Sequence, residues 1–446
     1  MTKRLLLSLL LFTFSLVEIS AQQTTFTVFD NILFYDGYAG VVSFATPPGV
    51  IRHRNDLYAK KLSATELAAF GSTMSIDVTI KASCDNYDRI GNVNLALVPI
   101  GSTTYVPENV QRIELGRYIT PFMNMNVMPN EVPYSFSVDN VAKIFKDPAI
   151  LAAYDIWIEL QVFGVPYAAQ TQVAGCAGRN DVFYGTLKFI SDSNLVVDAN
   201  EVLMPLNFQK NLNNYQVDAT DVVGQTVRTI NFNLPAAVDN AKFYLITSNH
   251  GANSGGEEYN RRIHYIYLDN NLILQYKPGE TTCEPYRVYN TQGNGIYGAT
   301  PRTNAQWQSF SNWCPGAKIP IRVISLGNLA AGAHSFKITV PSAVFANGEG
   351  YFPISLYLQG TATSLGIEDD FTYDSSYSFY PNPTSDITRI NTMEEVSSVA
   401  VYNLLGQKVW KGNSKQIDLS SAETGVYNVQ VEFISGKILN QKIVKQ

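Results

Sequence analysis

Short stretches of alternating apolar and polar residues recur along this chain, and most are closed by Gly, Pro, Asn or Asp. The clearest are Ile156–Val162, Ile263–Leu268, Ile321–Leu326, Phe336–Val340 and Ile354–Leu358. Alternation puts every second side chain on one face, which is typical of a half-buried strand. Helical patterns are few, at Ala64–Phe70 and at Val141–Phe145 after Asp139. This distribution predicts an all-β protein built from antiparallel sandwiches.

The composition agrees with a β-rich exported protein. Charged residues make up only 16% of the 446 residues and aromatic residues 12%, with 26 Tyr and 23 Phe. Strands favour aromatic side chains. The net charge of −6 argues against a nucleic-acid partner, which would require a basic surface.

The N-terminus has the order of a secretory signal. Lys3 and Arg4 precede the apolar run Leu5–Val17, and small residues ending at Ala21 follow. The run is shorter than the roughly 20 residues of a membrane span. We therefore expect residues 1–21 to be a signal peptide, and an exported mature protein without a transmembrane segment.

Six residues, Cys84–Arg89, interrupt two strand patterns, Ile76–Ile80 and Val93–Leu97. They place two carboxylates, a phenol ring and a guanidinium on a loop between rigid strands. Functional side chains are often found on loops that a scaffold holds in this way.

This loop resembles the catalytic loop of the peptide-N-glycosidase F family, which reads Cys-Asp-aromatic or acid-Trp-Asp-Arg. Other segments resemble that family in the same order: Thr27–Asp30, Gly116–Phe122, Trp313–Gly316 and the following Pro320 and Arg322. The resemblance spans Thr25–Leu358 and is that of a divergent member. It implies two jelly-roll sandwiches side by side, over residues 22–192 and 200–363, with the site in the cleft between them.

The C-terminal region resembles a different module. After an acidic, Ser- and Tyr-rich stretch come the landmarks Pro381-Asn382-Pro383, Leu405-Gly406-Gln407 and Gly425-Val426-Tyr427. Their order is similar to the type A C-terminal sorting domain of the type IX secretion system. We expect a linker over 364–378 and a small immunoglobulin-like sandwich over 379–446, with the type IX machinery as a partner and a secreted or cell-surface location. The alternative is an ordinary small sandwich without a sorting role.

Four cysteines in an exported chain favour disulfides. The family resemblance implies a bridge between Cys283 and Cys314, which would stabilise the fold by roughly 2–4 kcal/mol by restricting the unfolded loop. The family also has a second cysteine just before its catalytic loop, but residues 81–83 here are Lys, Ala and Ser. Cys84 either pairs with Cys176 or stays free.

The family hydrolyses the amide between an asparagine side chain and the first N-acetylglucosamine of an N-glycan, giving aspartate and a glycosylamine. The reaction needs a carboxylate to activate water, donors for the developing oxyanion and a proton for the leaving nitrogen, and it needs no metal or cofactor. The resemblance assigns the carboxylate to Asp88, whose alternative role is to cap a turn. Asp85 is expected to be structural, accepting hydrogen bonds from backbone amides.

Two further acids match catalytic positions of the family. Glu159 shares a strand face with Trp157, and an acid beside an aromatic ring suits a sugar; the alternative is a solvent-facing Glu. Glu258 matches the second essential acid, and its alternative is a solvated charge cluster. The cysteines that flank this Glu in the family are here Gly256 and Asn260, so we expect a looser loop, and a loose carboxylate loses rate.

The expected substrate-binding residues are Tyr87, Arg89, Trp157, Arg262 and Arg322. Arg89 either contacts substrate or balances Asp88, and a structural ion pair is the alternative for Arg322. Tyr87 and Gln161 stand where the family has Trp, and the loop Asn249–Ala252 differs from its Trp-containing counterpart. We expect a monomer that acts on N-glycoproteins with a changed glycan or peptide preference.

Three other functions compete with this one. A glycan-binding protein with an inactive site fits the lost Trp residues. An endo-acting glycoside hydrolase also uses two carboxylates. A copper monooxygenase is rejected because none of the four histidines, His53, His250, His264 and His334, is paired at ligand spacing.

Overall fold

The computed structural model describes residues 23–192, 200–253, 256–293, 296–309, 312–363, 378–392, 394–403, 407–436 and 438–446. The expected signal peptide, most of the expected boundary at 191–200 and nearly all of the expected linker lie outside these ranges. Among the described residues, no helix is long and apolar enough to cross a membrane.

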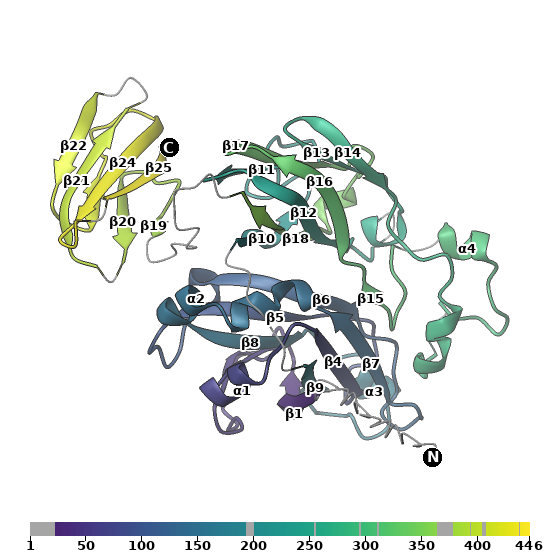
Figure 1. The fold of residues 1–446 in the computed structure, drawn as a ribbon. Helices are drawn as coiled ribbons and strands as arrows, with labels where there is room; N and C mark the ends of the chain where they lie inside the picture. Colours follow the sequence, from purple (N-terminus) through teal and green to yellow (C-terminus); the bar gives the residue numbers. More distant parts are fainter. Residues whose placement is uncertain are drawn as a thin grey trace, which may run out of the picture.

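The N-terminal part of the chain forms two facing sheets (Figure 1). One sheet has the order β1-β9-β4-β7, with bounds Thr24–Tyr35, Asp181–Ser191, Met74–Ala82 and Glu131–Ser137. The other has the order β15-β6-β5-β8-β3-β2, with bounds Lys318–Ile319, Gln111–Ile119, Ile90–Pro99, Tyr154–Val162, Leu57–Lys61 and Val50–Arg54. The predicted alternation is confirmed in β4, where Ile76, Val78 and Ile80 are buried between the sheets.

The next part of the chain forms a second pair of sheets. Their orders are β10-β18-β12-β16 (Glu201–Leu212, Phe352–Ala362, Val238–Thr247, Arg322–Leu329) and β11-β17-β13-β14 (Val227–Leu234, Gly332–Thr339, His264–Leu268, Asn271–Tyr276). Phe243 and Phe336 meet edge to face in the core between them, with ring centroids 5.4 Å apart. The strands predicted from alternation in this half are confirmed.

Helices are short. The α-helices are α1 (Ala64–Ala68), α2 (Pro148–Ala153), α3 (Ala169–Gln172) and α4 (Asn304–Gln308). The 3-10 helices are η1 (Pro107–Asn109), η2 (Asp139–Phe145), η3 (Glu257–Tyr259), η4 (Glu284–Tyr289) and η5 (Ala346–Gly348). Ser63 and Glu66 form a capping box that begins α1. The helical pattern at Val141–Phe145 proves to be part of a 3-10 helix.

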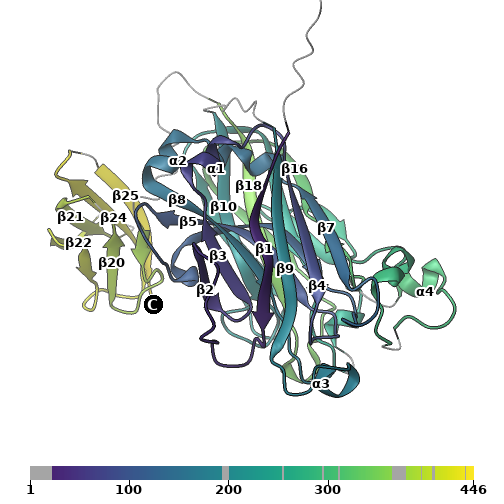
Figure 2. The ribbon, with the colours of Figure 1, turned by 90° about the horizontal axis from the view of Figure 1, so that it is seen from below.

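A third, smaller unit lies to one side of the others in both views (Figures 1 and 2). It pairs the sheet β19-β20-β23 (Ser378–Tyr380, Ile387–Asn391, Gln416–Asp418) with β22-β21-β24-β25 (Lys408–Gly412, Val396–Tyr402, Gly425–Phe433, Ile438–Lys445). Tyr427, Val429, Val431 and Phe433, which alternate along β24, are buried in its own core. The all-β prediction is therefore confirmed for all three units.

The two large sandwiches are joined by polar contacts as well as by β15. Arg117 on β6 and Glu114 form a doubly hydrogen-bonded ion pair with no exposed surface. Arg117 reaches across to the Pro353 carbonyl at 2.8 Å, and Ser355 donates to Glu114. The pair lies on β6, and its hydrogen bonds to Pro353 and Ser355 on β18 fix the relative position of the two sheets.

Candidate active site

A pocket of about 280 Å³ opens where the two large sandwiches meet. Its lining comes from the loop after β4, the end of β6, the loop between β12 and β13, and the segment after η4. The lining residues are Tyr87, Asp88, Arg89, Ile90, Ile119, Phe122, His250, Ala252, Glu258, Tyr259, Ile296 and Trp313. Four of the eight predicted site residues therefore come together here: Tyr87, Asp88, Arg89 and Glu258.

The loop Cys84–Arg89 is held at both of its ends. Cys84 is bonded to Cys176, and the Arg89 amide donates to Thr120 Oγ1 at 2.8 Å. A second disulfide, Cys283–Cys314, lies in the segment that brings Ile296 to the pocket. Asp85 is buried and accepts from the amides of Tyr87 at 2.9 Å and Val165 at 2.6 Å. These contacts are those of an acid that shapes the loop.

Asp88 is the acid of this loop whose carboxyl group is not taken up by contacts that hold the loop. Its Oδ2 is sealed from solvent and has no hydrogen-bond partner among the described residues. Burial, and then the negative charge of Glu258, raise the pKa of Asp88 well above its usual range, while Arg89 opposes them. A carboxyl group in this state keeps its proton to a higher pH than an ordinary aspartate does.

Glu258 approaches the pocket from the second sandwich. Its side chain is buried, its Oε2 accepts a hydrogen bond from the Gly251 amide at 3.4 Å, and the Tyr259 hydroxyl bonds to it. Burial raises the pKa of Glu258. Asp88 and Glu258 thus form a pair of carboxyls, one from each sandwich, whose environment disfavours two negative charges.

The turn that carries Glu258 is tied by hydrogen bonds where the family uses cysteines. The buried Asn312 donates from Nδ2 to the carbonyls of Glu257 and Glu258, each at 2.7 Å, and of Asn260 at 3.2 Å. Glu257, fully buried, binds Arg262 through both carboxyl oxygens at 3.0 and 3.1 Å. Residues 257–260 are therefore anchored by hydrogen bonds, and a looser loop than in the family stays a prediction.

Position 256 requires glycine because the backbone there passes very close to the backbone at Gly251. A Cβ atom at this position would lie 2.0 Å from the Gly251 carbonyl oxygen, inside any permitted contact. The substitution of a family cysteine by glycine here thus accompanies a different local packing.

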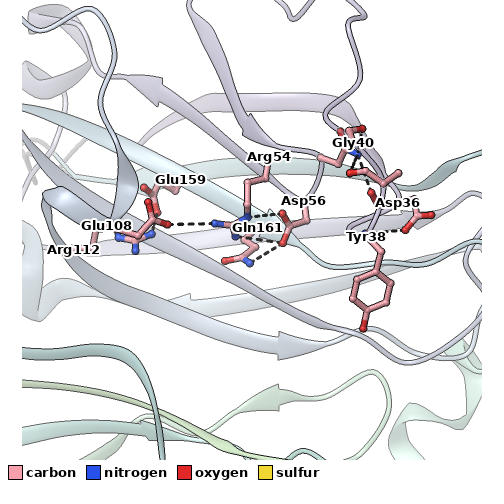
Figure 3. A network of polar contacts seen from close by, with 11 residues as sticks. Asp36, Tyr38, Gly40, Arg54, Asp56, Glu108, Arg112, Glu159 and Gln161 are labelled. Carbon is pink, nitrogen blue, oxygen red and sulfur yellow. Dashed lines mark hydrogen bonds and ion pairs between the residues drawn. The ribbon is translucent and has the colours of Figure 1, made fainter. Parts of the chain in front are cut away.

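Glu159 lies outside the pocket lining, in a row of polar side chains on the outer face of β5 and β8 (Figure 3). It has no exposed surface and accepts from Asn94 at 3.0 Å, Tyr105 at 2.8 Å and Arg112 at 3.4 Å. Asn94 is its partner across the strands and is four residues beyond Ile90, or about 13 Å along β5 at about 3.3 Å per residue. The alternative of a solvent-facing Glu159 disagrees with this burial, and the sugar-binding role expected for it is not supported by a place in the pocket lining.

Three other predicted site residues also lie outside the lining. Trp157 is 3% exposed and packs against Tyr105, so in this structure its ring does not offer a face to a sugar. Arg262 is engaged by Glu257, as described above. Arg322 stacks on the Tyr276 ring, with its guanidinium carbon 4.0 Å from the centroid. Gln161, which stands where the family has Trp, donates from Nε2 to Asp56 at 2.9 Å.

Several lining residues were not predicted, namely Phe122, His250, Tyr259 and Ile296. Phe122 falls within a segment that resembles the family, and its ring lies 5.6 Å from that of Tyr87. His250 falls in the loop singled out for its difference from the family. Among the described residues, no three His, Cys, Asp or Glu side chains gather as a metal site would require.

The structure is that of a protein with two large β-sandwiches and a pair of carboxyl groups in the pocket between them. The sequence matches the family model for the peptide-N-glycosidase F N-terminal domain over residues 25–177 and that for its C-terminal domain over 218–359. A third model, the secretion system C-terminal sorting domain, matches residues 378–446. The chain is a divergent member of the peptide-N-glycosidase F family with a type IX sorting tail, and that tail directs it to the cell surface or the medium.

Similar folds occur among solved structures. PNGF-II aligns with 21% identity and a TM-score of 0.55, covering 77% of this chain and 66% of PNGF-II. PNGase F, described as a glycosylasparaginase from Flavobacterium meningosepticum, aligns with 15% identity and a TM-score of 0.47, covering 77% of this chain and 97% of that one. The chain thus spans about two thirds of PNGF-II, and no curated protein matches it.

Proposed function

We propose that this protein is an exported amidase that cleaves the bond between an asparagine side chain and N-acetylglucosamine in N-glycoproteins, giving aspartate and a glycosylamine. The observation that carries the proposal is the pair Asp88 and Glu258, which reach one pocket from two sandwiches. The proposal includes jelly-roll topology for the large sandwiches, an immunoglobulin-like tail and a monomeric enzyme.

In this proposal Asp88 is the base. Asp88 lines the pocket, where its carboxylate can accept a proton from a water molecule that attacks the amide carbon. Its raised pKa makes its carboxylate a stronger base than an ordinary aspartate.

Glu258 has the complementary role. Its raised pKa favours a protonated carboxyl, which can give its proton to the leaving nitrogen as the C–N bond breaks. The positive charge of Arg89 lowers the pKa of both acids and so favours one negative charge in the pair, which we assign to Asp88. The proton taken by Asp88 and the proton given by Glu258 balance over the reaction.

The remaining predicted residues act less directly. Tyr87, which is 38% exposed, offers aromatic surface for the first sugar beside the buried Phe122. We propose that Glu159 orders the polar row beside the pocket, together with Arg112, and does not touch the scissile amide. Trp157, Arg262 and Arg322 support the strands and turns around the site. Fewer accessible rings than in the family support a changed glycan or peptide preference.

The experiment that tests the function uses the whole chain on a denatured N-glycoprotein in water labelled with heavy oxygen. Mass spectrometry of the former glycosylation site separates three outcomes. Labelled aspartate supports the amidase. Asparagine that keeps one sugar identifies an endo-acting glycoside hydrolase, and an untouched glycopeptide across several glycan types identifies a glycan-binding protein with an inactive site.

A further inference from the structure

A chain of polar contacts leads from the buried ion pair between the sandwiches to the wall of the pocket. Arg117, held by Glu114, donates from Nη1 to Ser248 Oγ at 2.9 Å. Ser248 Oγ lies 2.7 Å from His250 Nε2, and His250 is one of the residues that line the pocket. The three residues that follow Glu114 in this chain come from β6 and from the loop after β12.

The direction of each hydrogen bond along this chain follows from the chemistry of its members. A guanidinium only donates, so Ser248 Oγ must accept from Arg117. Ser248 is 2% exposed, and its own proton therefore needs an acceptor within the protein. Among the described residues the acceptor within reach is His250 Nε2. His250 Nε2 is consequently unprotonated, and the ring proton of a neutral imidazole must be on Nδ1.

The surroundings of His250 keep its ring uncharged and its Nδ1 accessible. Burial and the nearby charge of Arg117 lower the pKa of His250 to about 3. The ring stacks on Tyr351 with centroids 5.4 Å apart. Nδ1 has no partner among the described residues, yet it is not one of their sealed polar atoms. It is therefore not fully buried, on a residue that lines the pocket.

We infer that Arg117, acting through Ser248, fixes His250 as the tautomer with a proton on Nδ1, and that this N–H donates a hydrogen bond to the oxygen of the amide that is cleaved. The second half of this inference rests on the proposed function. As water attacks, the amide oxygen gains negative charge, and a fixed donor in a water-poor site stabilises it. A neutral imidazole serves this purpose without releasing its proton, so Asp88 and Glu258 alone move protons.

The tautomer is tested without any substrate. The chain contains four histidines, so ¹⁵N labelling of histidine in the full chain gives four ring spin systems. At pH 7 we expect one of them, lost in His250→Asn, to show a protonated Nδ1 and a bare Nε2. Ser248→Ala should turn that signal into a mixture of tautomers. A proton on Nε2 in the wild type, or no change in Ser248→Ala, would overturn the tautomer assignment.

Two matched substitutions test the donor role. The amide nitrogen of an asparagine side chain reaches the position of Nδ1, whereas that of glutamine reaches the position of Nε2. We expect His250→Asn to keep kcat within about tenfold and His250→Gln to lose on the order of a hundredfold or more, with KM changed little. The reverse order would overturn the donor role, provided that both variants melt like the wild type.

The two parts of the inference fail separately. If the wild type hydrolyses no amide, the proposed function and the donor role both fall, whereas the tautomer is still decided by the spectra. If the wild type is active and both variants keep wild-type kcat, only the donor role falls.

Discussion

Arg89 Nε donates to Asp85 Oδ2 across 2.7 Å and makes no hydrogen bond to Asp88, the residue directly before it in the chain. The Arg89 guanidinium therefore binds Asp85, the acid that holds the loop backbone in place. Asp88 retains a long-range attraction to Arg89 and an unbonded oxygen. Asp85 thus supports the fold, whereas Asp88 remains able to take part in chemistry. Replacing the two acids by asparagine should therefore change the stability of the protein in opposite directions.

Asp85→Asn should destabilise the protein. It removes the charge that pairs with Arg89 and weakens the acceptor for the Tyr87 and Val165 amides. We expect the free energy of unfolding to fall by about 2–3 kcal/mol, measured by urea denaturation. An unchanged denaturation midpoint would contradict the structural role.

Asp88→Asn should instead stabilise the folded state in a pH-dependent way. Because the folded pKa of Asp88 is raised, its ionisation opposes folding, and the wild type loses stability as the pH rises from the usual carboxyl range through the raised value. Relative to the wild type, the variant should gain melting temperature at pH 8 and little at pH 4. A gain that is equal at both pH values would show that the pKa of Asp88 is not raised.

Glu258→Gln should move the titration of Asp88. It removes a negative charge that raises the pKa of Asp88, so the pKa of that carboxyl should fall. The measurement is an NMR titration of ¹³C-labelled aspartate carboxyls in the wild type and in the variant. Residual activity, where present, should also begin at lower pH. An Asp88 titration that stays in place would refute the coupling between the two acids.

Asn312→Ala should loosen the Glu258 turn. The substitution leaves three carbonyls, those of Glu257, Glu258 and Asn260, without their side-chain donor. We expect a loss of about 1–3 kcal/mol in stability and a lower kcat. Asn271→Ala, at an exposed strand end, is the matched control and should change stability by less than about 0.5 kcal/mol.

The family's disulfide cannot be restored to compensate for that loss. Since a Cβ at Gly256 would clash with the Gly251 carbonyl, Gly256→Cys together with Asn260→Cys should lower the melting temperature. A higher melting temperature would show that the loop adopts the family's conformation.

The strands were predictable because alternation is a local property. The buried rows Ile76, Val78 and Ile80 in β4, and Tyr427, Val429 and Val431 in β24, were evident from spacing alone. Motif resemblance placed Asp88 and Glu258 at one site although 170 positions separate them in the sequence. The helical pattern at Val141–Phe145 was less informative about the type of helix. Five residues are too few to distinguish an α-helix from a 3-10 helix.

The contacts that set side-chain direction were not predictable. Whether Trp157 faces a sugar or packs under Tyr105 depends on what covers that face of the sheet. Glu257 and Glu258 are neighbours in the 3-10 helix η3, but only Glu257 forms an ion pair with Arg262. The sequence does not show which of the two side chains faces this arginine. His250 depends on Arg117, more than 100 residues earlier, and no local pattern encodes that contact.

The most direct test of Asp88 as the base is the rate at which Asp88→Asn releases glycan from a glycopeptide in a single turnover, compared with the wild type, with affinity for the same glycopeptide measured alongside. We expect the rate to fall on the order of a hundredfold or more while affinity changes only a few-fold, because Asp88 acts on the attacking water. Release by Asp88→Asn at the wild-type rate would show that Asp88 is not the base.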